Sequence, residues 1–107
     1  MTTTTALPPE LANHLDEIRV LCDRYGIRAL YVFGSAVHGT FDPTSSDLDF
    51  LLDAGERGVD FLLRIGNFSY DLERLVGRRI DLLLSDAPRN ARFMDEVRST
   101  RVLLHAS

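Results

Sequence analysis

Several residue types that often decide a first interpretation are scarce in this chain of 107 residues. Its single cysteine, Cys22, excludes an internal disulfide and fits a protein of the reducing cytoplasm. No apolar run is long enough to span a bilayer, and the N-terminal stretch MTTTTALPPE lacks the basic and then apolar layout of a secretory signal. These absences predict a cytoplasmic protein with no membrane partner.

Positive charge is limited as well. The formal net charge of −4 argues against direct binding to nucleic acid, because such binding depends on neutralising phosphates. Lysine is absent, so all 12 basic residues are arginine. Arginine suits bidentate recognition of phosphate or carboxylate, although codon usage is the better explanation of this bias.

The length of the chain predicts a single domain over residues 1–107, and its polar start predicts that residues 1–7 are disordered. Helical spacing begins near Pro8 and ends at Gly26, and it returns between an expected cap at Asp60 and Gly77. A short third helix is expected after a cap at Ser85 or Asp86.

Strand patterns fill the intervals between these helices. Apolar or alternating runs occupy residues 29–33, 46–53, 78–84 and 101–106. The resulting order is α-β-β-α-β-α-β. We therefore expect an α+β (α/β) fold, a small mixed sheet with helices packed on it.

The second of these strands, SDLDFLLD, contains aspartates inside an apolar pattern. Leu48, Phe50 and Leu52 share one face, whereas Asp47 and Asp49 point to the other. The third strand, RRIDLLL, repeats the pattern: Asp81 lies between apolar neighbours. If the two strands are adjacent, three carboxylates converge on one face of the sheet.

Converging carboxylates repel one another and need cations. Oxygen ligands that leave positions open for phosphate favour Mg²⁺, and two ions would serve displacement at phosphorus. The sequence therefore predicts that Asp47, Asp49 and Asp81 are both metal ligands and catalytic residues. The competing interpretation places Asp47 and Asp49 on the solvent-exposed face of an edge strand. A further aspartate between apolar neighbours on a second strand, Asp81, argues against it.

A Gly-Ser pair after the first strand predicts a phosphate site. Gly34 allows a close approach of backbone to ligand, and Ser35 can begin a turn whose N–H groups donate hydrogen bonds to phosphate oxygens. Arg79 shares the face of Asp81 and is expected to hold phosphate or an aspartate. Ser46 is expected to bond either phosphate or loop backbone, and Arg78 to be a solvated charge.

Together, GSAVHGTFDPTSSDLDFLL and RRIDLLL resemble the minimal nucleotidyltransferases of the DNA polymerase-β-like superfamily. The resemblance extends over roughly residues 10–105 and implies that superfamily's fold. It implies nucleotide binding by Gly34 and Ser35, metal binding by Asp47 and Asp49, and orientation or deprotonation of the attacking hydroxyl by Asp81. ATP is the implied substrate.

Two features depart from the family pattern. The spacer between Ser35 and Asp47 is one residue longer than the commonest form, and His38 stands where many members have arginine. Such proteins are similar to antitoxins paired with a HEPN-type toxin, and the implied reaction transfers AMP from ATP to a tyrosine of that toxin.

Two alternatives remain open at this stage. One is transfer to a hydroxyl of a small molecule, and the other is a non-catalytic module that neutralises a toxin by binding it. A chain of this length has little room for an acceptor pocket of its own, which favours a protein acceptor. Apolar strands at a sheet edge are also compatible with a homodimer.

Overall fold

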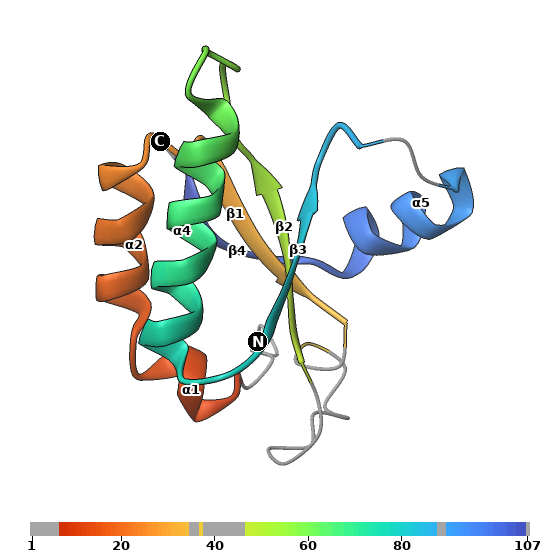
Figure 1. Cartoon of the computed structure of the whole chain (residues 1–107). Helices are drawn as coiled ribbons and strands as arrows, with labels where there is room; N and C mark the ends of the chain where they lie inside the picture. Colours follow the sequence, from red (N-terminus) through yellow and green to blue (C-terminus); the bar gives the residue numbers. More distant parts are fainter. Residues whose placement is uncertain (1–6, 35–36, 38–46, 88–89, 107) are drawn as a thin grey trace.

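A computed structural model describes residues 7–34, 37, 47–87 and 90–106. Its centre is a sheet of four strands in the order β3-β2-β1-β4 (Figure 1). β1 pairs antiparallel with both β2 and β4, whereas β2 and β3 are parallel. The mixed sheet is confirmed. The strands are Ala29–Phe33 (β1), Leu48–Asp53 (β2), Ile80–Leu84 (β3) and Val102–Ala106 (β4).

Helices lie on both sides of this sheet. α2 and α4 lie on one side and α5 extends from the other (Figure 1). The described helices are Pro9–Ala12 (α1), Leu15–Arg24 (α2), Phe61–Val76 (α4) and Ala91–Thr100 (α5).

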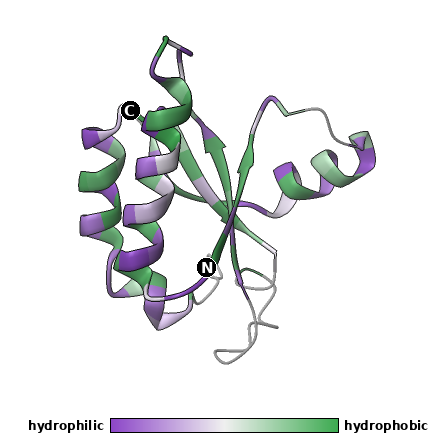
Figure 2. Cartoon of the chain, in the orientation of Figure 1, coloured by the Kyte–Doolittle hydropathy of each residue, from purple (hydrophilic) through white to green (hydrophobic). Residues whose placement is uncertain are grey.

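The side of the sheet that faces α2 and α4 carries most of the buried apolar surface. Leu48, Phe50 and Leu52 are fully buried there, as the alternation in β2 predicts. Phe68 and Leu72 of α4 close the same cluster. Figure 2 shows the strands as mostly hydrophobic, while α2 and α4 alternate hydrophobic and hydrophilic residues.

The opposite side of the sheet has a smaller core. Leu51 and Leu83 contact Met94 and Val97 of α5, with Tyr31 and Phe33 packed beside them. Arg101 lies over the Tyr31 ring, with its guanidinium carbon 4.0 Å from the ring centroid. Among the described residues, α5 is the only helix that packs on this face, and Asp49 is only partly buried there.

The prediction of one continuous helix between Pro8 and Gly26 is wrong, because this segment divides into α1 and α2. The N–H of His14 bonds to Leu11 O at 3.0 Å, a tighter turn than the helical repeat, and Asn13 precedes it. Asparagine competes for backbone hydrogen bonds and favours such ends. α4, in contrast, runs unbroken through Gly66 and ends at Gly77 with φ +69°, as expected.

The two predicted helix caps have different outcomes. Asp60 occupies the N-cap position of α4 as predicted, but its side chain makes no capping hydrogen bond. The prediction for α5 is wrong. Neither Ser85 nor Asp86 begins α5, since Asn90 does: its side-chain oxygen accepts the N–H groups of Arg92 (2.9 Å) and Phe93 (3.2 Å). Asparagine is a strong cap, and both bonds satisfy amides that the helix leaves free.

Across the part of the chain that the structure describes, every helix is too short or too polar to cross a membrane.

Candidate functional site

The two acidic strands are neighbours, as the site prediction requires. In the parallel register of β2 and β3, Asp49 is the partner of Asp81. The Leu48 N–H donates to Arg79 O at 3.1 Å, which extends the pairing beyond the first residue of β3. Adjacent strands lie about 4.8 Å apart, so these two aspartates are near neighbours on one face.

Burial of the alternate residues explains this arrangement. Leu48 and Phe50 of β2 and Leu82 of β3 pack into the large core, which leaves the intervening residues for the other face. Asp49 is partly buried there, while Asp47 and Asp81 are exposed. The carboxylates thus owe their position to the apolar residues between them.

Within the described residues, the negative charge on this face is poorly compensated. Burial raises the pKa of Asp49 to about 6, and repulsion by Asp81 and Asp47 adds to the increase. Among the described residues, no ion pair includes any of these three aspartates. A cation at this position would therefore stabilise the ionised carboxylates.

Gly34 lies against the same carboxyl group. Its φ is +78°, and a Cβ built on it would come within 2.5 Å of Asp49 Oδ2. Only glycine fits both the backbone conformation and this space. The Val37 N–H donates to Gly34 O at 3.0 Å, so the chain turns directly after β1. Ser35, Ser46 and His38 lie outside the described residues, as do residues 1–6 of the segment predicted to be disordered.

The two arginines before β3 differ in role. Arg79 is exposed, and its guanidinium makes no hydrogen bond or ion pair to any residue that the structure describes. It remains available for an anion. Arg78 contradicts its predicted role as a solvated charge: its side chain is only 14% exposed and pairs with Glu10 at 3.4 Å. It thereby links α1 to the start of β3.

The donor set fits Mg²⁺ but does not enclose it. In residues 7–34, 37, 47–87 and 90–106, no group of three acidic, histidine or cysteine side chains already forms a metal site. Mg²⁺ commonly takes only one or two carboxylates and completes its shell with water and substrate phosphates. The opposed pair Asp49 and Asp81 meets that requirement.

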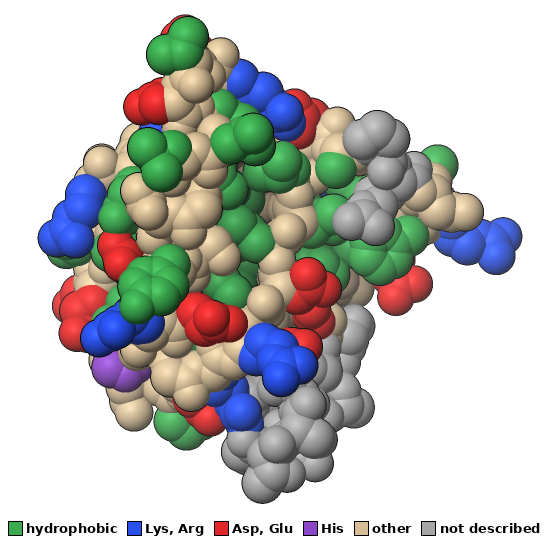
Figure 3. Space-filling view, viewed as in Figure 1, with side chains coloured by type: hydrophobic (Ala, Val, Ile, Leu, Met, Phe, Trp, Pro, Cys, Tyr) green, Lys and Arg blue, Asp and Glu red, His purple; other side chains and the backbone are tan. Residues whose placement is uncertain are grey.

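A hollow of about 280 Å³ opens beside these carboxylates. Asp49 and Asp81 line one part of it, and Phe33 of β1 and Phe93 of α5 line another, together with Leu82 and Leu83. In the space-filling view, acidic and hydrophobic side chains lie together between β3 and α5 (Figure 3).

Our sequence interpretation missed the two phenylalanines. Phe33 shares its strand face with Tyr31, and it pairs in register with Asp49. Phe93 follows the Asn90 cap by three residues. The available signal was an aromatic residue, Phe93, at the start of a helix that follows an acidic strand. The sequence of that helix does not specify which side of the sheet it packs against.

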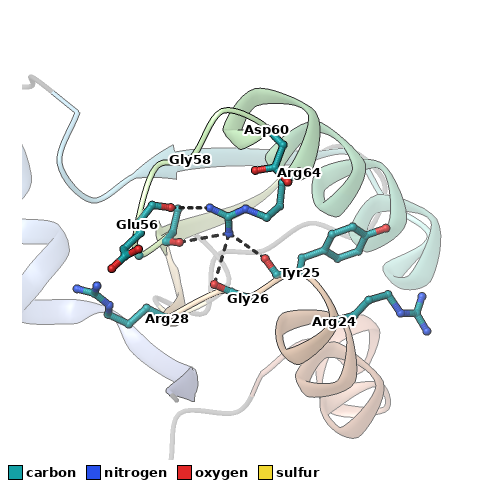
Figure 4. Close-up of a pocket in the computed structure, with 10 residues that line it drawn as sticks. Arg24, Tyr25, Gly26, Arg28, Glu56, Gly58, Asp60 and Arg64 are labelled. Atoms are coloured by element: carbon teal, nitrogen blue, oxygen red, sulfur yellow. Dashed lines mark hydrogen bonds between the residues drawn. The ribbon is translucent and has the colours of Figure 1, made fainter.

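A larger hollow of about 690 Å³ lies at the other end of β1 and β2 (Figure 4). Arg64 fills its centre and donates to the carbonyls of Tyr25 and Glu56, both at 2.8 Å, and to those of Gly26 and Ala54. Its charge is therefore used to join the α2–β1 and β2–α4 connections. This hollow brings together no pair of aspartates from neighbouring strands.

Comparison with known proteins shows which family this chain resembles. The family model described as a nucleotidyltransferase domain matches residues 17–102. The protein adenylyltransferase MntA of Thermococcus cleftensis is 34% identical over 87 residues, which is 81% of this chain and 82% of that protein.

Solved structures agree with this match. A structure described as a putative minimal nucleotidyltransferase has a TM-score of 0.74 and 26% identity, covering 94% of this chain and 98% of that one. A toxin–antitoxin structure with AMP-PNP has a TM-score of 0.67 at 18% identity, covering 87% of this chain and 73% of that one. The latter likeness concerns the fold.

Proposed function

Because this chain belongs to the nucleotidyltransferase domain family and is a nucleotidyltransferase, we propose that it transfers AMP from ATP to a tyrosine hydroxyl of a partner toxin of the HEPN type and so acts as an antitoxin. The observation that carries the proposal is the register pairing of Asp49 with Asp81 beside Gly34. The name of the Thermococcus relative supports adenylyl transfer to a protein. The cytoplasm supplies ATP and is the proposed compartment.

The residues have distinct roles in this proposal. Asp47, Asp49 and Asp81 hold Mg²⁺, with two ions expected once ATP is bound. When bound, Mg²⁺ would supply positive charge against the phosphates and the attacking oxygen. Gly34 and Ser35 bind the triphosphate through backbone N–H groups, and Ser46 and Arg79 add contacts to phosphate oxygens.

The chemical step is a displacement at the α-phosphorus. The acceptor oxygen forms a bond to that phosphorus, and the bond to the bridging oxygen of the β-phosphate breaks, so pyrophosphate leaves. The hydroxyl proton passes to the exposed Asp81 carboxylate. The protein's main contribution is to place the acceptor and the nucleotide in line, since the leaving group needs no covalent help.

The test uses α-labelled and γ-labelled ATP in separate reactions with Mg²⁺, this protein and protein extract from its host. We expect label from α-labelled ATP alone to enter a discrete protein band. The Asp49→Asn change should lower the rate at least about 1,000-fold, because several kcal/mol of charge stabilisation depends on that carboxylate.

Asp53→Asn is the matched control. Asp53 lies on the same face of β2 as Asp49, but it contacts Arg28 (3.8 Å) and the Gly55 N–H (3.0 Å) at the far end. It should leave transfer unchanged. Label from γ-labelled ATP would indicate a kinase and contradict the proposal. Toxin neutralisation that survives Asp49→Asn without any label would instead support a binding module.

A further inference from the structure

We propose that the hollow between Phe33, Phe93, Asp49 and Asp81 binds the aromatic ring of the acceptor, so that the enzyme selects hydroxyls on aromatic rings over aliphatic ones. This inference rests on the proposed function and adds the surface that recognises the acceptor. Phe33 and Phe93 are binding residues in this proposal, and they take no part in the proton transfer.

The aromatic part of the lining, Phe33 and Phe93, favours an uncharged occupant, whereas the carboxylates at the other part are assigned to Mg²⁺. Two carboxylates and two phenyl rings meet in the hollow, and no cation is among the described residues that line it. A triphosphate would need arginine or metal on every side, so it does not suit the aromatic part. The volume of about 280 Å³ lies below the range of roughly 300–1,000 Å³ typical of pockets that hold whole small molecules. One aromatic side chain fits a hollow of this size.

Phe93 is held in a way that suits a binding role. Its backbone N–H donates to the Asn90 cap, and buried Met94 and Val97 fix the helix against the sheet. Its ring meets the Phe33 ring edge to face, with centroids 6.3 Å apart and planes at 77°. Yet 45% of Phe93 stays exposed, so a third ring has room to pack against it.

The positions of the phenyl rings and the carboxylates in the hollow then decide which acceptor hydroxyl reacts. A ring placed against Phe33 and Phe93 directs a hydroxyl on its far edge toward Asp49 and Asp81, which line the same hollow. A serine hydroxyl sits on a short stem, so it would leave the aromatic part empty and lose its contacts. Selection follows from the ring contacts alone.

The experiment measures the initial rate of label transfer from α-labelled ATP into the acceptor band at limiting host extract. Phe93→Ala should lower this rate about tenfold, the loss of one aromatic contact and its buried area, and leave KM for ATP unchanged. Phe93→Tyr should restore the rate. N-acetyltyrosinamide should compete with the band in the wild-type reaction, whereas N-acetylserinamide should not.

Tyr70→Ala is the matched control, because Tyr70 is an aromatic residue 60% exposed on α4 and it does not line the hollow. It should keep the wild-type rate. An undiminished rate in Phe93→Ala would overturn this inference alone. A raised KM for ATP in that variant would also overturn it and assign the hollow to the nucleotide base. No label with the wild-type protein would overturn the proposed function and this inference with it.

Discussion

The two faces of the sheet differ in what their side chains do: one face is buried in the large core, and the other carries the carboxylates. Toward α2 and α4, Leu48, Phe50 and Leu52 of β2 are completely buried. Toward α5, β2 presents the partly buried Asp49 next to Leu51, and only a small cluster closes around Leu51 and Leu83. One face supplies the stability that lets the other hold like charges at close range. The difference shows how a short chain keeps a strained charge cluster without unfolding.

The largest expected effect is a difference in stability loss between variants in the hydrophobic clusters on the two faces of the sheet. Leu72→Ala, on the buried face, should lower the free energy of unfolding by about 3–4 kcal/mol, because a fully buried leucine leaves a cavity in the large cluster. Met94→Ala, in the small cluster, should cost about 2 kcal/mol. Urea unfolding of both variants measures this.

Activity should show the reverse order in these two variants. At a temperature where both are folded, Met94→Ala should lose more transfer than Leu72→Ala, because α5 carries Phe93. Equal losses would mean that the two faces are not functionally distinct.

Gly34→Ala tests the contact between the turn and the carboxylate. We expect a loss of about 1–2 kcal/mol from the left-handed backbone alone. Since the added Cβ would lie 2.5 Å from Asp49 Oδ2, the carboxyl group must also move, and transfer should fall much further than stability accounts for. Thermal unfolding and transfer rates are measured on the same sample.

Gly77→Ala provides the comparison. Its φ of +69° imposes similar backbone strain, but a Cβ there meets nothing within 4 Å. It should lose similar stability and keep its transfer activity. Equal activity losses in both variants would remove the specific role of Gly34.

A smaller effect concerns pH and the charge on Asp49. The pKa of Asp49 in the folded protein, about 6, lies above the ordinary aspartate value of 3.8, so the stability that this carboxyl group contributes is fully present below pH 3.8 and is lost as the pH rises through 6. Asp49→Asn should therefore gain about 1 kcal/mol over the metal-free wild type above pH 6, a value reduced for partial exposure. Unfolding between pH 4 and pH 8 without metal measures it. A constant difference over this window would contradict a pKa of Asp49 raised by burial and by the neighbouring Asp81 and Asp47.

The smallest effect is a gain on the stable face. Gly66 lies inside α4, is exposed, and a Cβ there would contact nothing within 4 Å. Gly66→Ala should raise the free energy of unfolding by about 0.5–1 kcal/mol, because alanine loses less conformational entropy in a helix. Transfer should be unchanged. A loss of stability would show that Gly66 has a packing role.

Local patterns in the sequence determined much of this protein. Alternation in SDLDFLLD and RRIDLLL placed Leu48, Phe50 and Leu82 inward, and burial of those residues turns Asp49 and Asp81 to the other face. Gly77 ended α4 as expected, since the left-handed conformation is local to one residue. Such features depend on the period of a strand or the φ of a residue, and both can be read along the chain.

Tertiary structure decided how these elements meet. The parallel pairing that brings Asp49 opposite Asp81 joins residues far apart in the chain, and no local pattern specifies that register. The same holds for Arg78, whose partner Glu10 lies on α1, and for Phe93, which reaches Phe33 only because α5 packs on the open face. The acidic residues of the site could be predicted from their chemistry and spacing in the sequence. The hollow beside them forms only because distant segments of the chain pack together.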